Sequence, residues 1–261
     1  MTKVLEGKKG LVVGIANDHS IAWGIATSEN EDGAILYPLY NCVTNKERVE
    51  RLSQQINCLG IMPCDVSDTA SLESVCDGIK DKLDFFVHAV AYSDKNELSG
   101  KYLHTSKENF LKTLHISAYS LTEMTRLLAP KMNDGASIMA LTYYGSTRYM
   151  QSYNVMGVAK AALETSIKYL AVDMGDRGIR VNAISAGPMR TLAGAVINKS
   201  RQIYNYTINN SPIKKPLSLD DIRKSSVYLM SDLSKGVTGE ILYVDNGYNN
   251  VGMSIQDLAG L

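Results

Sequence analysis

Short apolar segments alternate with helix-like segments along nearly the whole chain of 261 residues. The apolar segments have the length of strands, and most are apolar throughout. Strands of this kind, separated by helices, form a parallel sheet that helices cover on both faces. We therefore predict an α/β fold with one doubly wound, seven-stranded parallel sheet, whose strands lie within residues 9–14, 33–40, 59–66, 84–91, 136–143, 179–187 and 239–247.

The intervening segments predict helices, and nothing divides the chain into separate domains. Neither a low-complexity linker nor an internal repeat is present, so we assign residues 1–261 to a single domain. Residues 191–216 follow the sixth strand and lack strong periodicity, so we predict that they form a flexible flap over a binding site at the carboxyl ends of the strands. The predicted helices cover about residues 21–31, 45–56, 69–83, 107–128 and 219–232, and one more contains Tyr153 and Lys160.

Charge and composition argue against several classes of function. The chain has 27 basic and 27 acidic residues, which gives no reason to expect nucleic acid or an anionic membrane as a partner. No run of about 18 apolar residues is present, and no cleavable signal sequence is recognisable, so we expect a cytoplasmic protein. The four cysteines lack paired spacing and the four histidines lie far apart, so we expect reduced thiols and no metal site.

The first strand-to-helix turn, within residues 12–26, has features of a phosphate-binding loop without the full G-x-G-x-x-G pattern. Gly14 permits a sharp turn of the backbone, and Ser20 can cap a helix that begins at Ile21. The free N–H groups at the start of that helix would then face a pyrophosphate, as in a Rossmann-type domain. An ordinary turn between a strand and a helix would look the same in isolation.

Residues at the ends of two further strands could contact a bound dinucleotide. Asn41 follows the second strand, where such folds often place an acidic residue for ribose hydroxyls or a basic residue for a 2′-phosphate. The nearest cation is Lys46, and no pair of arginines stands at this strand end to bind a phosphate, which favours NADH over NADPH. Asp65, at the end of the third strand, could accept the adenine amino group while the Val66 backbone helps to fix the ring, or it could instead cap the next helix.

The segment YNVMGVAK (153–160) places a tyrosine and a lysine seven residues apart. On a helix this spacing is nearly two turns, so we expect both side chains to point the same way, about 10 Å apart along the axis. That separation is too long for a direct hydrogen bond and suits two polar groups that hold different ends of one bound molecule. When the segment is considered alone, a position of both residues on the solvent-exposed face of an amphipathic helix explains the pair at least as well.

Together these features resemble the short-chain dehydrogenase/reductases, and more narrowly the bacterial NADH-dependent enoyl-acyl-carrier-protein reductases. Ordinary members of the superfamily have a lysine four residues after the tyrosine and a serine thirteen before it, whereas positions 157 and 140 here are glycine and alanine. In the enoyl reductases the lysine lies seven after the tyrosine and a second tyrosine lies ten before it, which Tyr143, Tyr153 and Lys160 match. The resemblance runs from about residue 7 to 253 and includes residues 20–26, 64–66, 153–160, 180–193 and 231–247.

The resemblance implies an activity, a cofactor and partners. The activity is reduction of the 2,3 double bond of trans-2-enoyl thioesters on acyl carrier protein by hydride from NADH, the last step of the bacterial fatty acid elongation cycle. The implied partners are the acyl carrier protein and further copies of the chain in a homotetramer.

The resemblance also implies the residues of the site. Tyr153 would donate to the carbonyl oxygen, Lys160 would hold the nicotinamide ribose, and Tyr143 would shape the acyl pocket as the third catalytic residue. Tyr144 leaves the choice of second tyrosine open, although neighbours on a strand point to opposite faces. Ser93 falls where the acyl substrate passes. The implied cofactor contacts are Gly14, Ser20, Ile21, Asn41, Asp65, Val66, Val90, Ala91, Lys160, Met189, Arg190, Thr191, Leu192 and Ala193.

Two other functions remain as alternatives. One is a carbonyl or alcohol dehydrogenase of the same superfamily, which the absence of a serine at position 140 argues against. The other is a catalytically silent dinucleotide-binding protein that acts as a sensor or scaffold. The presence of both Tyr153 and Lys160 argues against that second alternative.

Overall fold

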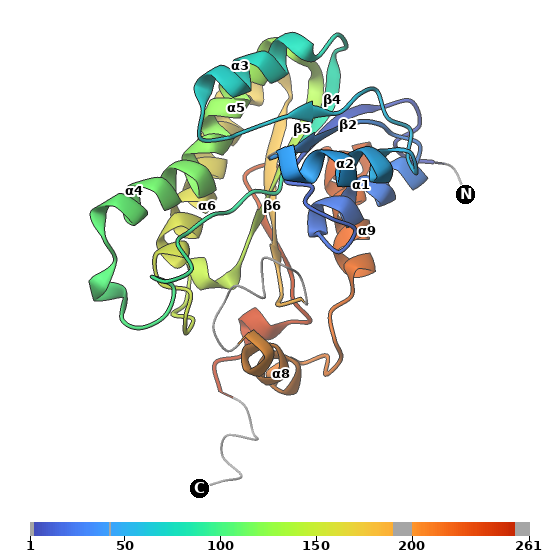
Figure 1. The fold of residues 1–261 in the computed structure, drawn as a ribbon. Coiled ribbons are helices and arrows are strands. Elements are labelled where there is room, and N and C mark those ends of the chain that lie inside the picture. The colour runs from blue at the N-terminus through green and yellow to red at the C-terminus, as the bar shows by residue number, and fades with distance from the viewer. Residues whose placement is uncertain (1–2, 42, 190–199, 254–261) are drawn as a thin grey trace, which may run out of the picture.

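Seven parallel strands form one sheet in the computed structural model, which describes residues 3–41, 43–189 and 200–253 (Figure 1). The strand order is β3-β2-β1-β4-β5-β6-β7, so the direction of winding reverses between β1 and β4. A reversal of this kind opens a crevice at the carboxyl ends of the two strands. The strands are β1 (Lys9–Val13), β2 (Ile35–Tyr40), β3 (Met62–Pro63), β4 (Leu83–His88), β5 (Met132–Thr142), β6 (Arg180–Ala186) and β7 (Ile241–Val244).

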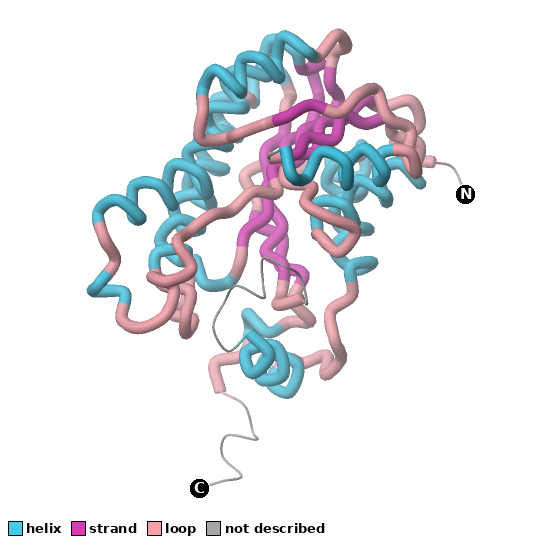
Figure 2. Tube along the Cα trace, in the orientation of Figure 1, coloured by secondary structure: helices cyan, strands magenta, loops and turns pink. Residues whose placement is uncertain are grey.

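Helices cover both faces of this sheet, as Figure 2 shows. The helices on one face are α3 (Thr69–Gly78), α5 (Ser120–Leu128) and α6 (Val155–Asp173), and those on the other are α1 (Ile21–Glu31), α2 (Val43–Ser53) and α9 (Leu219–Met230). Within the described residues, the other α-helices are α4 (Lys107–Leu114) and α8 (Ser200–Asn210). No helix in these described ranges is long and apolar enough to cross a membrane.

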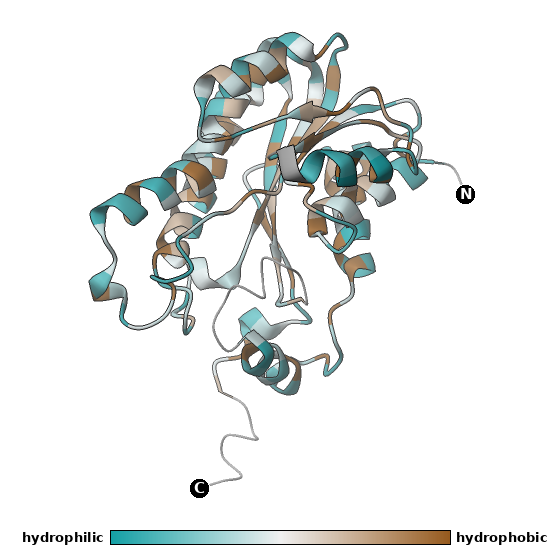
Figure 3. Ribbon diagram, in the orientation of Figure 1, coloured by the Kyte–Doolittle hydropathy of each residue, from teal (hydrophilic) through white to brown (hydrophobic). Residues whose placement is uncertain are grey.

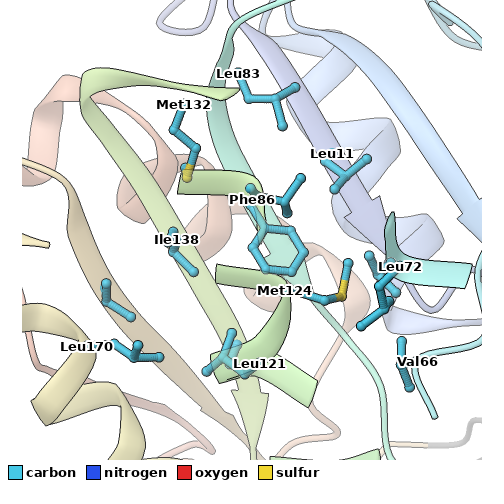
Figure 4. Close-up of a cluster of buried hydrophobic side chains, with 14 of the residues drawn as sticks. Leu11, Val66, Leu72, Leu83, Phe86, Leu121, Met124, Met132, Ile138 and Leu170 are labelled. Atoms are coloured by element: carbon cyan, nitrogen blue, oxygen red, sulfur yellow. The ribbon is translucent and has the colours of Figure 1, made fainter. Parts of the chain in front are cut away.

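Two apolar cores hold the helices to the sheet, because successive side chains of a strand point to opposite faces. Leu11 and Phe86 belong to the core beneath α3, α5 and α6, whereas their neighbours Val12 and Phe85 belong to the core beneath α1, α2 and α9. Figure 4 shows Phe86 at the centre of the first core. Hydrophobic residues follow the central strands, while outer helices such as α2 carry hydrophilic ones (Figure 3). The predicted single α/β domain with a seven-stranded parallel sheet is therefore confirmed.

Several predicted boundaries differ from the observed ones. The third strand, predicted over residues 59–66, is reduced to Met62–Pro63, because a proline has no N–H for the ladder and this strand lies at the edge of the sheet. The helix predicted over 107–128 contains a π-helical turn at His115–Tyr119. Residues 191–216, predicted as an irregular flap, contain the regular helix α8.

Candidate active site

A large cavity of ≈ 1390 Å³ lies at the carboxyl ends of the strands. His88 at the end of β4 pairs with Val13 of β1 on one side and with Ala140 of β5 on the other, so the loops after these three strands emerge side by side. Ordinary pockets for small molecules have roughly 300–1,000 Å³. The cavity is therefore large enough for a dinucleotide together with a second molecule.

Most of the predicted site residues line this cavity. Those found in its wall are Gly14, Ser20, Ile21, Asn41, Val90, Ala91, Ser93, Tyr143, Tyr153, Lys160 and Met189. Arg190, Thr191, Leu192 and Ala193 lie outside the described residues.

The turn after β1 has the geometry expected of a phosphate-binding loop. Gly14 has φ +104°, and a Cβ atom there would lie 2.2 Å from the carbonyl oxygen of Ala89, so this position accepts only glycine. Ser20 caps α1 as predicted, since its Oγ accepts the N–H of Trp23 at 3.3 Å and the helix begins at Ile21. The N-terminal turn of α1 thus borders the cavity. Backbone N–H groups at the N-terminus of a helix can bind the negatively charged oxygens of a pyrophosphate.

Asp65 and Val66 are absent from the described wall of the cavity. The Asp65 carboxylate accepts the backbone N–H of Ser67 at 2.9 Å and its hydroxyl at 2.6 Å, and Val66 is buried in the core beneath α3. The alternative in which Asp65 caps the next helix is wrong, because Asp68 is the N-cap of α3. Contact of Asp65 and Val66 with adenine stays a prediction.

Tyr153 does not lie in a helix, which corrects the prediction that one helix carries both Tyr153 and Lys160. Helix α6 begins at Val155, and the residues on either side of Tyr153 have positive φ angles, +61° at Ser152 and +41° at Asn154. Such angles are incompatible with a right-handed helix. Tyr153 and Lys160 still line the same cavity, but from a turn and from a helix, respectively.

Tyr153 and Tyr143 line the cavity and pack against each other. Their rings meet edge to face with centroids 4.9 Å apart, and Tyr153 is only 8% exposed. Burial is the main cause that raises the pKa of both hydroxyls above the ordinary value, so both stay protonated. Tyr144 packs instead against Tyr243 and Tyr248, and among the described residues only Tyr143 of the two neighbours lines the cavity.

Lys160 lines the same cavity as the two tyrosines and is buried, at 5% exposure. Its Nζ donates to the carbonyl oxygen of Leu141 at 2.7 Å. Burial lowers the pKa of Lys160 to about 8, and the carboxylate of Glu164 acts in the opposite direction. Glu164 is itself held by the Thr142 hydroxyl, which donates to it at 2.6 Å.

His88 is fully buried and lies close enough to Lys160 for the lysine charge to act on it. Burial, together with the positive charge of Lys160, lowers the pKa of His88 to about 3, so its ring is neutral. Its Nε2 lies 2.8 Å from the hydroxyl of Ser120. His88 therefore adds no positive charge near Lys160.

Ser93 and its neighbours occupy the side of the cavity between β4 and α4. The Thr113 hydroxyl lies 3.0 Å from the Ser93 hydroxyl, and Asn109 Oδ1 accepts the N–H of Asp94 at 2.9 Å. Lys112 Nζ lies 5.0 Å from the centre of the Tyr92 ring, which also lines the cavity.

Two glycines that the sequence did not identify as part of the site leave the space that the Tyr153 ring and its turn occupy. A Cβ atom at Gly145 would lie 2.5 Å from Cδ1 of Tyr153, and one at Gly157 would lie 2.7 Å from the carbonyl oxygen of Gly145. Gly157 therefore lets α6 approach the turn that follows β5. Nothing in the local sequence indicates this contact, because Gly145 and Gly157 meet only in the folded chain.

The doubly wound sheet, the glycine turn after β1 and the Tyr143–Tyr153–Lys160 cavity define the class of protein, a reductase of the short-chain dehydrogenase/reductase type. The model of the family described as "Enoyl-(Acyl carrier protein) reductase" matches residues 14–249. The chain belongs to this family, so the resemblance read from the sequence is confirmed.

Individual relatives and solved structures agree with this assignment. Enoyl-[acyl-carrier-protein] reductase [NADH] 2 of Rhizobium meliloti (strain 1021) is 51% identical over 97% of this chain and 96% of its own length. The crystal structure of FabI from Candidatus Liberibacter asiaticus has a TM-score of 0.95 at 49% identity and covers 97% of this chain and 100% of that chain. The reductase of Anaplasma phagocytophilum, solved in complex with NAD, has a TM-score of 0.93 at 48% identity over 96% of this chain and 97% of that chain.

Proposed function

We propose that this protein reduces the 2,3 double bond of trans-2-enoyl thioesters on acyl carrier protein, with NADH as the reductant, in fatty acid elongation. The observation that carries the proposal is the meeting of Tyr143, Tyr153 and Lys160 in one cavity that also contains the glycine turn of a dinucleotide site. A chain with this family's spacing of tyrosines and lysine, but without the shared cavity, would not support it.

The described residues fit a dinucleotide. Gly14 has no room for a side chain, and the N-terminal end of α1 offers free N–H groups to a pyrophosphate. Lys160 would hold the hydroxyls of the nicotinamide ribose, and Asn41 would approach the adenosine ribose. When bound, NADH supplies the hydride for the β-carbon of the substrate. The remaining proposed contacts with the cofactor are those of Ser20, Ile21, Asp65, Val66, Val90, Ala91, Met189, Arg190, Thr191, Leu192 and Ala193.

Tyr153 is the group that we assign to the thioester carbonyl. Negative charge develops on that oxygen during reduction, and a hydrogen-bond donor aimed at it stabilises the transition state more than the substrate. Burial keeps the Tyr153 hydroxyl protonated, so that it donates throughout the physiological pH range. Tyr143 packs against Tyr153 and shapes the acyl pocket together with Ser93.

Lys160 contributes a positive charge to the same cavity. Its ammonium group already donates to the Leu141 carbonyl, which fixes the position of Nζ, and Glu164 favours the charged form. A fixed cation in a buried cavity strengthens every interaction with a developing negative charge nearby.

The proposal also includes an acyl carrier protein that delivers the substrate and a homotetramer as the oligomeric state. Arg201 lines the cavity, and Lys214 and Lys215 follow α8, so an acidic carrier protein would be steered to this side; Lys199 lies outside the described residues. Exposed apolar residues on α6, Tyr169 at 71% and Val172 at 78%, support burial against further copies of the chain in a homotetramer. We further propose that residues 191–216 act as the flap over the substrate and that the protein works in the cytoplasm.

One assay separates this function from its alternatives. Purified protein should oxidise NADH with a crotonyl or longer 2-enoyl thioester and leave simple ketones unreduced. Activity on 3-oxoacyl substrates alone would support a carbonyl reductase, although the buried Ala140 offers no hydroxyl for that chemistry. Cofactor binding without any turnover would support a silent dinucleotide-binding protein.

A further inference from the structure

The segment after β4 contacts the turn that carries Tyr153. Ser93, Asp94, Lys95 and Leu98 of this segment line the cavity. Leu98 is 5% exposed and packs in one small apolar cluster with Tyr153 and its neighbours. The position of this segment and the position of the tyrosine are therefore linked by direct packing.

The side chain of Asn154, the residue next to Tyr153, makes a second link between the two. Its Nδ2 lies within hydrogen-bond distance of three carbonyl oxygens of the segment, at 3.1 Å from Glu97, 3.2 Å from Leu98 and 3.4 Å from Gly100. One amide group thus holds four residues of backbone against the turn that precedes α6. These bonds join parts of the chain that are more than 50 residues apart, as the separation of 54 between Asn154 and Gly100 shows.

Helix capping does not account for this asparagine. Asn154 is the N-cap residue of α6, where an asparagine normally accepts an N–H of the first turn with its side chain. Here, among the described residues, its side chain makes no capping bond. The amide is turned to the segment 97–100 instead, and the backbone at Asn154 has φ +41° and ψ −124°, a conformation that residues other than glycine rarely adopt.

We propose that Asn154 is a positioning residue, which fixes the Tyr153 hydroxyl relative to the substrate side of the cavity by holding residues 97–100 with its amide. The catalytic part of this proposal rests on the proposed function, whereas the structural part does not. A strained backbone that packing and hydrogen bonds hold in place is a recurring feature of functional sites. Hydrogen bonds from the Asn154 side-chain amide to the carbonyl oxygens of Glu97, Leu98 and Gly100 are the contacts that hold Asn154 in this conformation.

Two substitutions at Asn154 distinguish the role of its side-chain amide from the role of its backbone conformation. Asn154→Asp keeps the shape and the capping ability of the side chain but replaces the donor with a carboxylate that faces three carbonyl oxygens. Asn154→Gly accepts the positive φ without strain and removes the side chain, so this variant should fold even if the aspartate variant does not. If Asn154 served only as a helix cap, the aspartate variant would behave like the wild type, because Asp and Asn are equivalent caps.

The test compares these variants with Asn30→Asp. Asn30 is a matched control, since its Nδ2 also donates to a backbone carbonyl, that of Ala34 at 2.8 Å. It lies at the C-terminal end of α1, whereas the N-terminal end of that helix borders the cavity. The measurements are hydrogen–deuterium exchange of residues 96–104, the Kd for NADH, and kcat and KM with a 2-enoyl thioester. We expect both Asn154 variants to exchange faster in residues 96–104 and to lose about 10- to 100-fold in kcat, with the Kd for NADH unchanged. Asn30→Asp should leave all of these quantities as in the wild type.

Wild-type exchange and kcat in both Asn154 variants would overturn the proposal, and so would a loss of kcat without any change in exchange. Faster exchange without a loss of kcat would also overturn it, because the hydrogen bonds would then have no catalytic role. The wild-type protein, assayed in parallel on the 2-enoyl thioester, tests the proposed function separately. If the wild type itself is inactive on that substrate, the exchange data still decide whether Asn154 holds the segment.

Discussion

Gly145 lies directly against the ring of Tyr153, so that a methyl group on Gly145 would come within 2.5 Å of Cδ1 and 2.9 Å of Cε1. The ring is buried and in contact with Tyr143, which leaves it little room to move aside. The position of the proposed catalytic hydroxyl therefore depends on the absence of a side chain at Gly145.

Gly145→Ala should accordingly reduce kcat while the Kd for NADH changes little. A displacement of about 1 Å at a reacting group can cost on the order of 100-fold in rate, so we expect a loss of about 10- to 100-fold. Steady-state kinetics with a 2-enoyl thioester measure it. Gly175→Ala is the matched control, because nothing lies within 4 Å of a Cβ atom there. Equal kcat values for the Gly145 variant and this control would contradict the account.

Gly14→Ala should weaken NADH binding, not only slow turnover. The new Cβ atom would lie 2.2 Å from the Ala89 carbonyl oxygen, and alanine disfavours the φ of +104°. We expect the Kd for NADH, measured by fluorescence titration, to rise by about 100-fold or more, since a loss of about 2.8 kcal/mol corresponds to 100-fold. Gly135→Ala has a similar positive φ, +77°, in open space and controls for backbone strain alone. If both variants bind NADH as the wild type does, the turn after β1 is not the phosphate site.

The affinity for NADH should fall as the pH rises through about 8, because burial lowers the pKa of the free Lys160 to about 8. Below this pH the ammonium is present and can hold the ribose hydroxyls, and above it the neutral amine predominates. Linkage limits the change to at most about tenfold per pH unit. The check is the Kd for NADH from pH 6 to about 9.5, a range that spans the cited value. In Lys160→Met the Kd should be higher and independent of pH, and an identical pH dependence in this variant would rule out Lys160 as the titrating group.

The sequence predicts the fold well because apolar strands and helical periodicity are local signals. The cap at Ser20 and the start of α1 at Ile21 were also correct, since capping chemistry is read from adjacent residues. The third strand was predicted too long because the edge of a sheet depends on pairing partners, and β3 pairs with β2 at only two positions.

The turn that carries Tyr153 was harder to predict. The sequence around Tyr153 is typical of a helix, yet the bonds from Asn154 to residues 97–100 accompany a conformation with positive φ that excludes a helix. The close contacts of Gly145 and Gly157 also come from segments that meet only after folding. The spacing of Tyr153 and Lys160 therefore identified the family, while the geometric reason first inferred from it, two turns of one helix, was wrong.

The most direct test of the account is the rate of NADH oxidation by Tyr153→Phe with a saturating 2-enoyl thioester. The variant removes only the hydroxyl, and its ring still fills the space against Tyr143 and Gly145. We expect kcat to fall by about 10²–10³ with an unchanged Kd for NADH, as for the loss of one donor to a developing oxyanion. Tyr143→Phe should lose much less. A Tyr153→Phe enzyme that turns over at the wild-type rate would contradict the assignment of this hydroxyl to the substrate carbonyl.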